Sequence, residues 1–298
     1  MRFTKVEGAG NDYVLVDETK CVVENPSQLA RRVSDRHRGV GSDGLLLVSP
    51  ASSEAVTLAG APIDASMRIF NADGSEGRMC GNGLRCVVRF LNERWGLPAD
   101  QLSIQTAAGL RVGRREADGA VWVGMGEPDF SPSSLPIDLP DRGELPAALA
   151  LPRQLLALLA NDVGAEPAVA LAVSIGNPHL VICLTDPERA DLELWGKVLQ
   201  ASPELAEGAN VHLVGRPSGG VMMARPYERG SGATKACGTG AVAIAAVARR
   251  MGWMDPANGD ELTISMPGGD LSVRWSGVGE AWLGGSASLV FDGELHTL

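Results

Sequence analysis

The chain has 298 residues, of which 45% are hydrophobic and 21% are charged, and its formal net charge is −10. This composition is typical of a globular protein long enough for two domains, and the acidic charge argues against a nucleic-acid partner. No apolar run reaches the ~18 residues of a membrane span, and the N-terminal sequence lacks the apolar core of a signal peptide. We therefore expect a cytoplasmic protein with no membrane partner.

The cysteines do not form a recognisable framework. They are Cys21, Cys80, Cys86, Cys183 and Cys237, with no C-x-x-C pair and with only four histidines in the chain. Neither a disulfide network nor a metal site is indicated, so no metal is predicted. Cys21, Cys86 and Cys183 are interpreted as small buried hydrophobic residues.

The first half of the chain predicts alternating strands and helices. Strands are expected over residues 1–6 and 13–17, joined by a turn at Gly10–Asn11, and a helix over residues 27–37. A second helix, with Leu84, Val87, Val88, Leu91 and Trp95 on one stripe, follows "MCGNG" at residues 79–83. A strand–turn–strand pattern covers residues 102–113, and a third strand over residues 120–126 contains Trp122.

The second half repeats this order. Strands at residues 168–175 and 180–184 flank a Gly176–Asn177 turn, and a helix is expected over residues 186–200, beginning at Asp-Pro-Glu. After "ACGTG" at residues 236–240 comes a helix that is apolar on every face and should be buried at the centre of its lobe. A strand–turn–strand pattern follows at residues 262–273, and a third strand at 280–286 contains Trp282. The same order of elements in both halves favours a duplication.

The repeat defines two α/β lobes. Residues 127–152 contain six prolines and are interpreted as the crossing between the lobes. The N-terminal lobe is placed at residues 1–126, with the tail 286–298 joining it, and the C-terminal lobe at residues 127–285.

Each Cys-Gly-x-Gly motif places a thiol at the start of a helix. Unpaired backbone N–H groups and the positive end of the helix dipole lower a thiol pKa there from ~8.5 towards neutrality. The glycines let a carboxylate approach those N–H groups. One such motif is weak evidence. Two motifs, brought to one cleft by a quasi-twofold axis, suit a reaction in which one thiolate removes a proton and the opposite thiol returns one to the other face.

Other polar residues fit a small polar substrate. Arg229 suits bidentate capture of a carboxylate and Glu228 suits an ammonium group, with a solvated loop as the alternative. His179 could tune a nearby thiol or be a structural histidine. Asparagines recur at turns and strand ends, where each alone is compatible with a structural role: Asn11, Asn71, Asn82, Asn177 and Asn210.

Together these motifs resemble the diaminopimelate epimerase family along the whole chain. The matching stretches are "GAGNDYVLVD", "RIFNADGSE", "MCGNGLRC", "SIGNPH", "GANV", "RPYERGSGATKACGTGA" and the "PGG" turn. The resemblance implies two pseudo-symmetric α/β lobes, each a curved mixed β-sheet wrapped around a central helix. It implies an isomerase without pyridoxal phosphate or another cofactor, which interconverts LL- and meso-2,6-diaminoheptanedioate for lysine and peptidoglycan synthesis.

The resemblance also implies roles for individual residues. Cys80 and Cys237 become the acid/base thiols, while His179 and Glu228 adjust the thiol pKa values. The implied substrate contacts are Asn11, Asn71, Gly81, Asn82, Asn177, Asn210, Glu228, Arg229, Gly238 and Thr239. The family is usually homodimeric, and Trp282 stands where an aromatic residue contributes to the dimer contact.

Two positions depart from the family pattern. Gly44 stands where some members carry a glutamine that contacts the substrate, and glycine has no side chain to make that contact. Tyr227 replaces a tryptophan found before Glu-Arg in many members.

Three other functions are compatible with parts of the pattern. A proline or hydroxyproline racemase uses a similar thiol pair, but those enzymes tend to have His where this chain has Asn82. A cysteine hydrolase with Cys237 as nucleophile and His179 as base would leave Cys80 unexplained. A noncatalytic amino-acid-binding protein on the same scaffold would not need both cysteines.

Overall fold

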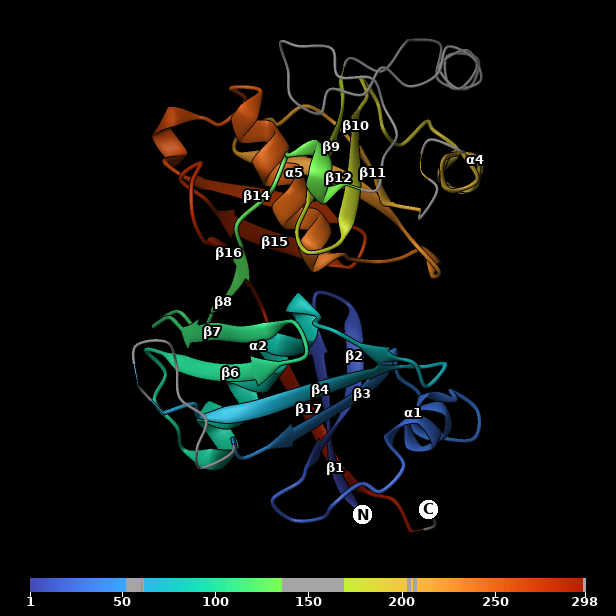
Figure 1. Cartoon of the computed structure of the whole chain (residues 1–298), viewed down its shortest axis with the longest axis vertical. Helices are drawn as coiled ribbons and strands as arrows, with labels where there is room; N and C mark the ends of the chain where they lie inside the picture. The colour runs from blue at the N-terminus through green and yellow to red at the C-terminus, as the bar shows by residue number, and fades with distance from the viewer. Residues whose placement is uncertain (52–59, 61, 136–168, 203–204, 206–207, 297–298) are drawn as a thin grey trace. The chain divides into compact units, whose positions relative to one another are not determined.

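The computed structural model describes residues 1–51, 60, 62–135, 169–202, 205 and 208–296 (Figure 1). The chain divides into two compact units, and each combines a mixed β-sheet with helices. Unit 1 comprises Met1–Gly124 and Gly284–Leu298, and unit 2 comprises Met125–Leu283. No helix in the described part of the chain is long and apolar enough to span a membrane.

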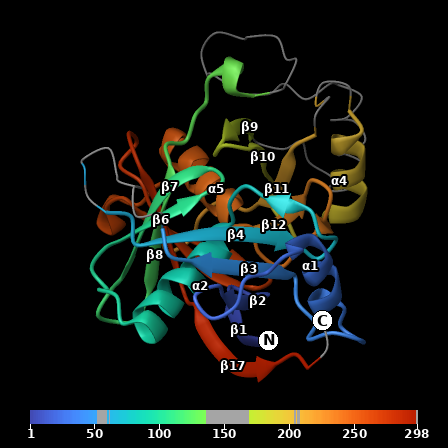
Figure 2. The ribbon, with the colours of Figure 1, turned by 60° about the horizontal axis from the view of Figure 1, so that its bottom comes forward.

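Unit 1 is built on a sheet with the order β17–β1–β2–β3–β4–β6–β7–β8, in which β2–β3 and β4–β6 are parallel and the other neighbours antiparallel. The strands are β1 (Arg2–Gly8), β2 (Asn11–Asp17), β3 (Gly44–Ser49), β4 (Ala65–Asn71), β5 (Glu76–Gly77), β6 (Leu102–Thr106), β7 (Gly109–Arg115), β8 (Val121–Gly126) and β17 (Ser288–Glu294). The helices are α1 (Pro26–Ser34) and α2 (Gly81–Phe90), which continues into the π-helical turn η1 (Leu91–Trp95). Figure 2 shows β17 beside β1.

Helix α2 is enclosed by the sheet of unit 1. It contacts β17, β1, β2, β4 and β7, strands that lie in different parts of the sheet order. The sheet must therefore curve around the helix. The expected apolar stripe is confirmed in its main part, since Leu84, Val87, Val88 and Leu91 are all buried.

Strand alternation separates the two faces of this sheet. Val14 and Leu45 pack in the same apolar cluster as Leu29 of α1. The alternate positions face α2: the Tyr13 hydroxyl contacts Cys80, and Leu46 lies against Gly83. Because side chains alternate between the two faces of the sheet, Tyr13 of β2 lies beside the start of α2.

Unit 2 repeats this plan around α5 (Gly238–Arg250), which contacts β9, β10, β11, β14 and β15. Its strands are β9 (Val169–Ser174), β10 (Pro178–Cys183), β11 (Asn210–Val214), β12 (Val221–Glu228), β13 (Gly232–Ala233), β14 (Glu261–Met266), β15 (Gly269–Arg274) and β16 (Ala281–Gly285). Helix α4 (Leu192–Gln200) and the 3-10 turns η2 (Pro132–Ser134) and η4 (Pro256–Asn258) complete the described elements. Every residue from Gly240 to Ala248 is buried, which confirms the predicted central position of α5 (Figure 1).

Two predicted elements differ in the structure. The helix expected over residues 186–200 begins only at Leu192, with Asp191 as its N-cap. The preceding segment forms no helix because the Arg225 guanidinium binds the carbonyl oxygens of Pro187, Glu188 and Ala190. The helix expected over residues 27–37 ends at Ser34.

The proline-rich crossing is described only at its beginning. Asp129 forms a backbone bridge with Ser174, and η2 follows it. The remainder of the expected crossing, residues 136–152, lies outside the described residues.

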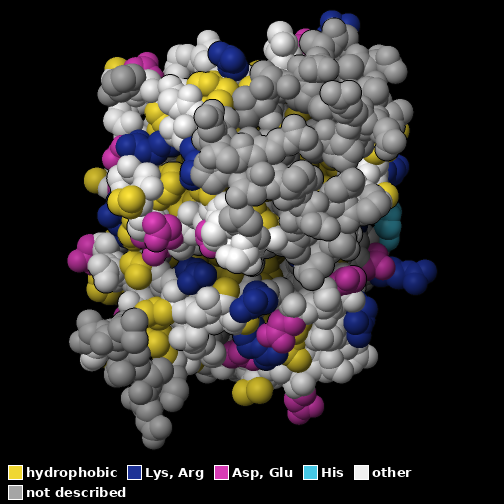
Figure 3. All heavy atoms as spheres, turned by 45° about the horizontal axis from the view of Figure 1, so that its top comes forward, with side chains coloured by type: hydrophobic (Ala, Val, Ile, Leu, Met, Phe, Trp, Pro, Cys, Tyr) yellow, Lys and Arg dark blue, Asp and Glu magenta, His cyan; other side chains and the backbone are white. Residues whose placement is uncertain are grey.

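The described surface carries ion pairs of ordinary type. Examples are Arg68–Glu76, Arg249–Asp260 and Arg274–Glu261. On the face shown in Figure 3, side chains of both charges lie next to one another. Exposed pairs of this kind each contribute only ~0–1 kcal/mol, so the buried helices and sheets carry most of the stability.

A close contact between α4 and β12 gives a first prediction. A Cβ atom at Gly196 would lie 2.2 Å from Cγ of the buried Tyr227 ring. Gly196→Ala should improve helix propensity by ~1 kcal/mol, but overpacking against the ring costs ~1–3 kcal/mol. We expect a net loss of about 1 kcal/mol in the free energy of unfolding, measured by urea denaturation.

The matched control for this prediction is Lys197→Ala. Lys197 is the next residue of α4 and forms only an exposed pair with Glu193, so its loss should change stability by less than ~0.5 kcal/mol. A stabilised Gly196→Ala variant would show that the ring moves aside without cost.

Candidate active site

Cys80 is the N-cap residue of α2, and its side chain does not cap the helix. The residue is partly exposed, and its Sγ lies 3.2 Å from the Tyr13 hydroxyl. The pKa of Tyr13 is raised well above its usual value, first by burial and then by the charge of a Cys80 thiolate. Tyr13 therefore stays protonated and can donate a hydrogen bond to the thiolate, a role that the sequence did not suggest.

Two predicted asparagines lie together at this helix start. Asn82 is buried and donates its side-chain N–H to Asn11 Oδ1 at 2.6 Å. Asn82 Oδ1 is itself buried with no hydrogen-bond partner among the described residues. A buried amide oxygen without a partner costs about 1–3 kcal/mol, so this atom is suited to accept a bond from a bound ligand.

Asn71 and Gly44 occupy the adjoining strand ends. They pair across β3 and β4, and the Asn71 amide donates to Ser75 within its own turn. A Cβ at Gly44 would lie 2.4 Å from the Phe70 carbonyl oxygen. No larger side chain fits at Gly44 without a shift of the strand, which gives a physical reason for the departure from the family pattern.

Cys237 is the N-cap residue of α5 and is only 3% exposed. Its thiol donates to Glu228 Oε2 at 3.1 Å, and Thr239 Oγ1 lies 3.6 Å from Sγ. Burial, followed by the charge of Glu228, raises the pKa of this thiol well above its usual value, although Thr239 and the Gly240 N–H act in the opposite direction. The expectation that the helix start lowers the thiol pKa is therefore wrong for Cys237.

Further predicted residues lie at the end of β12 and at the start of its neighbour β11. Thr234 donates to Glu228 Oε1 at 2.6 Å and so fixes the carboxylate beside Cys237. The Asn210 side chain accepts from the Arg229 N–H at 3.0 Å and donates to the Pro178 carbonyl at 3.3 Å. The Arg229 side chain is exposed at this strand end, where it can reach a ligand.

A pair of buried histidines lies beside the same thiol. His179 Nε2 is 2.9 Å from Asn177 Oδ1, and His179 Nδ1 is 2.9 Å from His212 Nε2. Burial lowers the pKa of both: that of His212 falls to about 3, and that of His179 falls well below its usual value. Both rings are therefore neutral near pH 7.

His212 is absent from the predicted set. The only sequence signal is a histidine inside the apolar strand sequence "NVHLV". One ligand atom each of His179, His212 and Cys237 lies within 4.8 Å of the others, and these are the described residues that could hold a metal ion.

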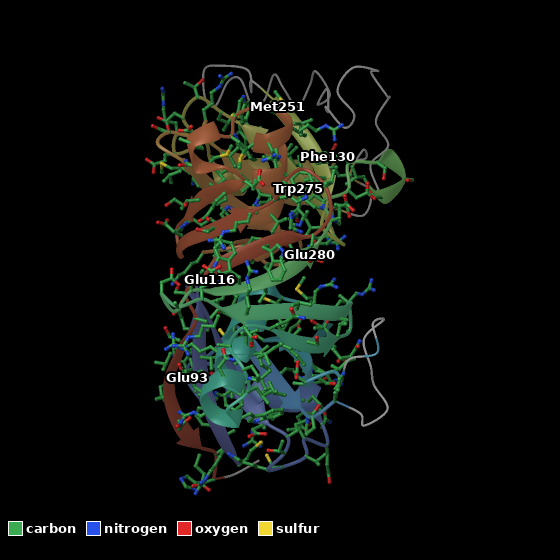
Figure 4. All side chains as sticks on the ribbon, turned by 90° about the vertical axis from the view of Figure 1, so that its left-hand side faces the viewer. Glu93, Glu116, Phe130, Met251, Trp275 and Glu280 are labelled. Atoms are coloured by element: carbon green, nitrogen blue, oxygen red, sulfur yellow. The ribbon has the colours of Figure 1, made fainter. Side chains whose placement is uncertain are left out.

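Two open surface hollows lie on unit 2, away from Cys237. One, of about 300 Å³, is lined by Phe130, Arg250 and Trp275 together with Glu127, Pro128, Ser131 and Gly277. Figure 4 shows the labelled Phe130 and Trp275 close together. The other, of about 380 Å³, includes Trp282. Neither hollow contains a thiol, so the chemistry of the chain points to the helix starts instead.

The overall fold is shared with known epimerase-like structures. A PhzF-family phenazine biosynthesis protein from Bacillus anthracis is 18% identical, with a TM-score of 0.69 over 100% of this chain and 99% of that one. A hydroxyproline epimerase from Agrobacterium vitis is 17% identical, with a TM-score of 0.64 over 98% of this chain and 91% of that one. At these identities the likeness concerns the fold alone, which is mixed α/β as the sequence predicts.

Sequence comparison identifies the family, which the likeness of the folds does not. The model of the diaminopimelate epimerase family matches residues 3–131 and 171–290. Relatives named diaminopimelate epimerase are 37% identical in Alkalilimnicola ehrlichii and 34% identical in Carboxydothermus hydrogenoformans, each over 99% of both chains. The chain belongs to the diaminopimelate epimerase family, which confirms the resemblance seen in its motifs.

The contact between Glu228 and Cys237 gives a prediction for thiol reactivity. A negative charge beside the sulfur disfavours the thiolate, so Glu228→Gln should lower the pKa of Cys237. Because only the thiolate is alkylated, Cys237 in this variant should react faster with iodoacetamide at any pH below its thiol pKa. Peptide mass spectrometry follows the reaction at Cys237 specifically.

Glu261→Gln is the matched control. Glu261 is a unit 2 carboxylate paired with Arg274, and it is not among the causes of the pKa shift at Cys237. Its removal should leave the pH profile of Cys237 alkylation unchanged. An unchanged profile in Glu228→Gln would mean that burial alone sets the thiol pKa.

Proposed function

We propose that this protein interconverts LL- and meso-2,6-diaminoheptanedioate by proton transfer at one α-carbon, without pyridoxal phosphate. The observation that carries the proposal is the recurrence of a cysteine as N-cap of the enclosed helix in each unit, at Cys80 and Cys237. Both cysteines lie within the family match. The expected metabolic role is the supply of lysine and peptidoglycan precursors.

The helix starts would bind the substrate's reacting end. Gly81–Asn82 and Gly238–Thr239 form the first residues of α2 and α5, where backbone N–H groups have no partner within the helix. These groups and the helix dipoles favour a carboxylate. Holding the α-carboxylate there also stabilises the negative charge that develops when the α-proton leaves.

The two thiols would act on opposite faces of the α-carbon. One thiolate takes the proton and becomes a thiol, while the other thiol gives its proton to the opposite face and becomes a thiolate. Tyr13 can stabilise a Cys80 thiolate, while Glu228 favours the protonated form of Cys237. The raised pKa of Cys237 supports this thiol as the proton donor, with Cys80 acting on the opposite face.

The remaining polar groups would recognise the amino and distal carboxyl groups. Glu228 suits an ammonium group, as does Asn82 Oδ1, which has no partner among the described residues, and Arg229 suits the distal carboxylate. Asn11, Asn71, Asn177 and Asn210 would complete the binding set. His179 lies near Cys237 and is assigned to tuning that thiol, together with Glu228.

Assembly and location follow from the family pattern. A homodimer with Trp282 in the contact and a cytoplasmic location remain predictions from the sequence. Sedimentation of the wild type and of Trp282→Ala would test the first.

A proline- or hydroxyproline-type racemase is the alternative. The hydroxyproline epimerase structure shares the fold, whereas the closer sequence relatives are named diaminopimelate epimerase. Incubation with LL-diaminoheptanedioate and, separately, with L-proline and trans-4-hydroxy-L-proline distinguishes the two by chiral chromatography. Turnover of an imino acid without formation of meso-diaminoheptanedioate would favour the alternative.

Isotope incorporation tests the two-thiol mechanism. In deuterated water, the thiol that delivers a proton has already exchanged with solvent. Early meso product formed from LL substrate should therefore carry deuterium at one α-carbon, while the remaining LL substrate stays almost wholly protiated. Mass spectrometry of the separated isomers measures both. Early product that keeps the substrate's own proton would indicate a single base.

Replacement of each thiol tests the assignment of Cys80 and Cys237. Either alanine variant should lose epimerisation, by at least about 100-fold, since one face then lacks its acid or base. The serine variants should be nearly as impaired because a hydroxyl is a much weaker acid. Cys86→Ala is the matched control: Cys86 is buried in α2 and not assigned to catalysis. Full activity in either Cys80→Ala or Cys237→Ala would refute the mechanism.

The role of Arg229 can be tested by replacing its bidentate guanidinium with the single ammonium group of lysine. Arg229→Lys should lower kcat/KM by roughly 10- to 100-fold, because a lost charge-assisted hydrogen bond costs ~1.5–3 kcal/mol. Arg249→Lys, which affects only the surface pair with Asp260, is the control. Lysine, which lacks the distal carboxylate, should be a very poor substrate of the wild type. Comparable turnover of lysine and diaminoheptanedioate would remove Arg229 from this role.

A further inference from the structure

Three potential metal ligands meet at the start of α5. His179 comes from β10, His212 from the parallel neighbour β11, and Cys237 from the N-cap of α5. One ligand atom of each lies within 4.8 Å of the others, and all three residues are buried. Because His179 pairs with Asn210 and Val181 with His212, the two histidines are neighbours on the same face of the sheet.

The hydrogen bonds between His179 and His212 leave one nitrogen, His212 Nδ1, without a partner among the described residues. With Asn177 Oδ1 as acceptor, His179 Nε2 carries the proton and His179 Nδ1 accepts from His212 Nε2. His212 Nδ1 is then an unprotonated nitrogen, fully buried and without a partner among the described residues. Buried polar atoms normally have a partner, and the proposed epimerase chemistry gives His212 no task.

The chain makes room for this ring beside the thiol. A Cβ atom at Gly240 would lie 2.3 Å from His212 Cε1, 2.8 Å from Nε2 and 3.0 Å from Nδ1. The nitrogen-bearing edge of the ring therefore faces the first turn of α5, the turn that Cys237 begins. Only glycine at position 240 permits that approach.

We propose that His179, His212 and Cys237 form a binding site for a divalent transition-metal ion of the zinc class. A thiolate with two imidazoles is a donor set that Zn²⁺ and Co²⁺ prefer, whereas Mg²⁺ and Ca²⁺ prefer oxygen ligands. Metal–nitrogen bonds of ~2.0–2.1 Å and metal–sulfur bonds of ~2.3 Å place tetrahedral ligand atoms roughly 3.3–3.7 Å apart. In the structure His179 Nδ1 and His212 Nε2 are 2.9 Å apart, and the three ligand atoms lie within 4.8 Å of one another, so binding requires the two rings to move apart by a few tenths of an ångström.

The surroundings of His179 have the pattern of a metal-bound imidazole. A ligating histidine usually donates its second ring N–H to an oxygen, which fixes the ring's orientation. His179 Nε2 has such a partner in Asn177 Oδ1 and leaves Nδ1 directed towards His212. On binding, the His212 proton would move from Nε2 to the unprotonated Nδ1, so that His179 Nδ1 and His212 Nε2 both face the metal. A water would complete four-coordination.

Binding would convert the thiol of Cys237 into a metal thiolate. The S–H bond breaks, a sulfur–metal bond forms and one proton passes to the buffer, without oxidation or reduction. Metal binding itself does not depend on the proposed function. Its consequence does: if Cys237 is an acid/base thiol, a bound metal ion blocks it, so zinc is a reversible inhibitor that chelation removes.

Cobalt titration tests the site directly. The untagged, reduced and metal-stripped full chain should bind one Co²⁺, with the near-ultraviolet sulfur-to-cobalt absorption and the intense visible bands of a four-coordinate thiolate site. Zn²⁺ should displace the cobalt, and a large excess of Mg²⁺ should not. In the epimerase assay, Zn²⁺ should abolish activity, and EDTA should restore it.

The decisive variant is His212→Gln, whose amide can still donate to His179 Nδ1 but offers no ring nitrogen. Its affinity for Co²⁺ and its sensitivity to Zn²⁺ should fall by at least about 10-fold, while epimerisation without metal stays within a few-fold of wild type. The double variant His37→Gln/His296→Gln is the control, because it removes the two exposed histidines. It should bind cobalt like the wild type.

Each outcome is informative. Cobalt binding of unchanged strength in His212→Gln, or cobalt binding without the sulfur band, overturns the site. If His212→Gln fails to fold, Cys237→Ser replaces it, since serine is a good N-cap residue and should abolish the sulfur band. A wild type that shows the cobalt spectrum but never epimerises would support the metal site and refute the proposed function.

Discussion

The structure depends on burying the start of a helix in each unit. A sheet that curves around α2 or α5 buries most of the helix, which favours apolar residues on its enclosed faces and leaves its first N–H groups without a partner within the helix. The buried run from Gly240 to Ala248 fits this preference for apolar residues. A cysteine at the N-cap supplies no oxygen to the helix, and so its sulfur stays available for chemistry.

The same motif gives two different thiols because the strands facing it differ. In unit 1, β2 presents the Tyr13 hydroxyl, a donor that burial keeps protonated. In unit 2, β12 ends at Glu228, an acceptor whose charge disfavours the thiolate. Two copies of one sequence motif therefore place their thiols in different surroundings, and the proposed two-base reaction would use that difference.

Sequence periodicity and motif order were enough to predict the central helices, most strands and the family. They were not enough where packing of distant segments decides the outcome. Arg225 binds the carbonyls before α4 and so delays that helix. The helix-start rule for thiols fails at Cys237 because the sulfur is buried and because Glu228 comes to lie beside it. Arg85 is fully buried within α2, and His212 within β11, although neither residue type predicts burial. These features arise only when separate elements pack.

The last glycine of each Cys-Gly-x-Gly motif shows how such packing can give a repeated motif a new property. Both glycines admit a strand side chain to the first turn of the helix: Leu46 lies 3.1 Å from an added Cβ at Gly83, and His212 lies 2.3 Å from one at Gly240. In unit 1 the contact is apolar and flexible, and it only fills space. In unit 2 the equivalent space holds the imidazole of His212, which has a ring nitrogen within 4.8 Å of the Cys237 sulfur. The glycine that lets a substrate carboxylate approach the helix thus also lets a strand place a ligand there, and the identity of that one strand residue decides whether the helix start can bind a metal ion.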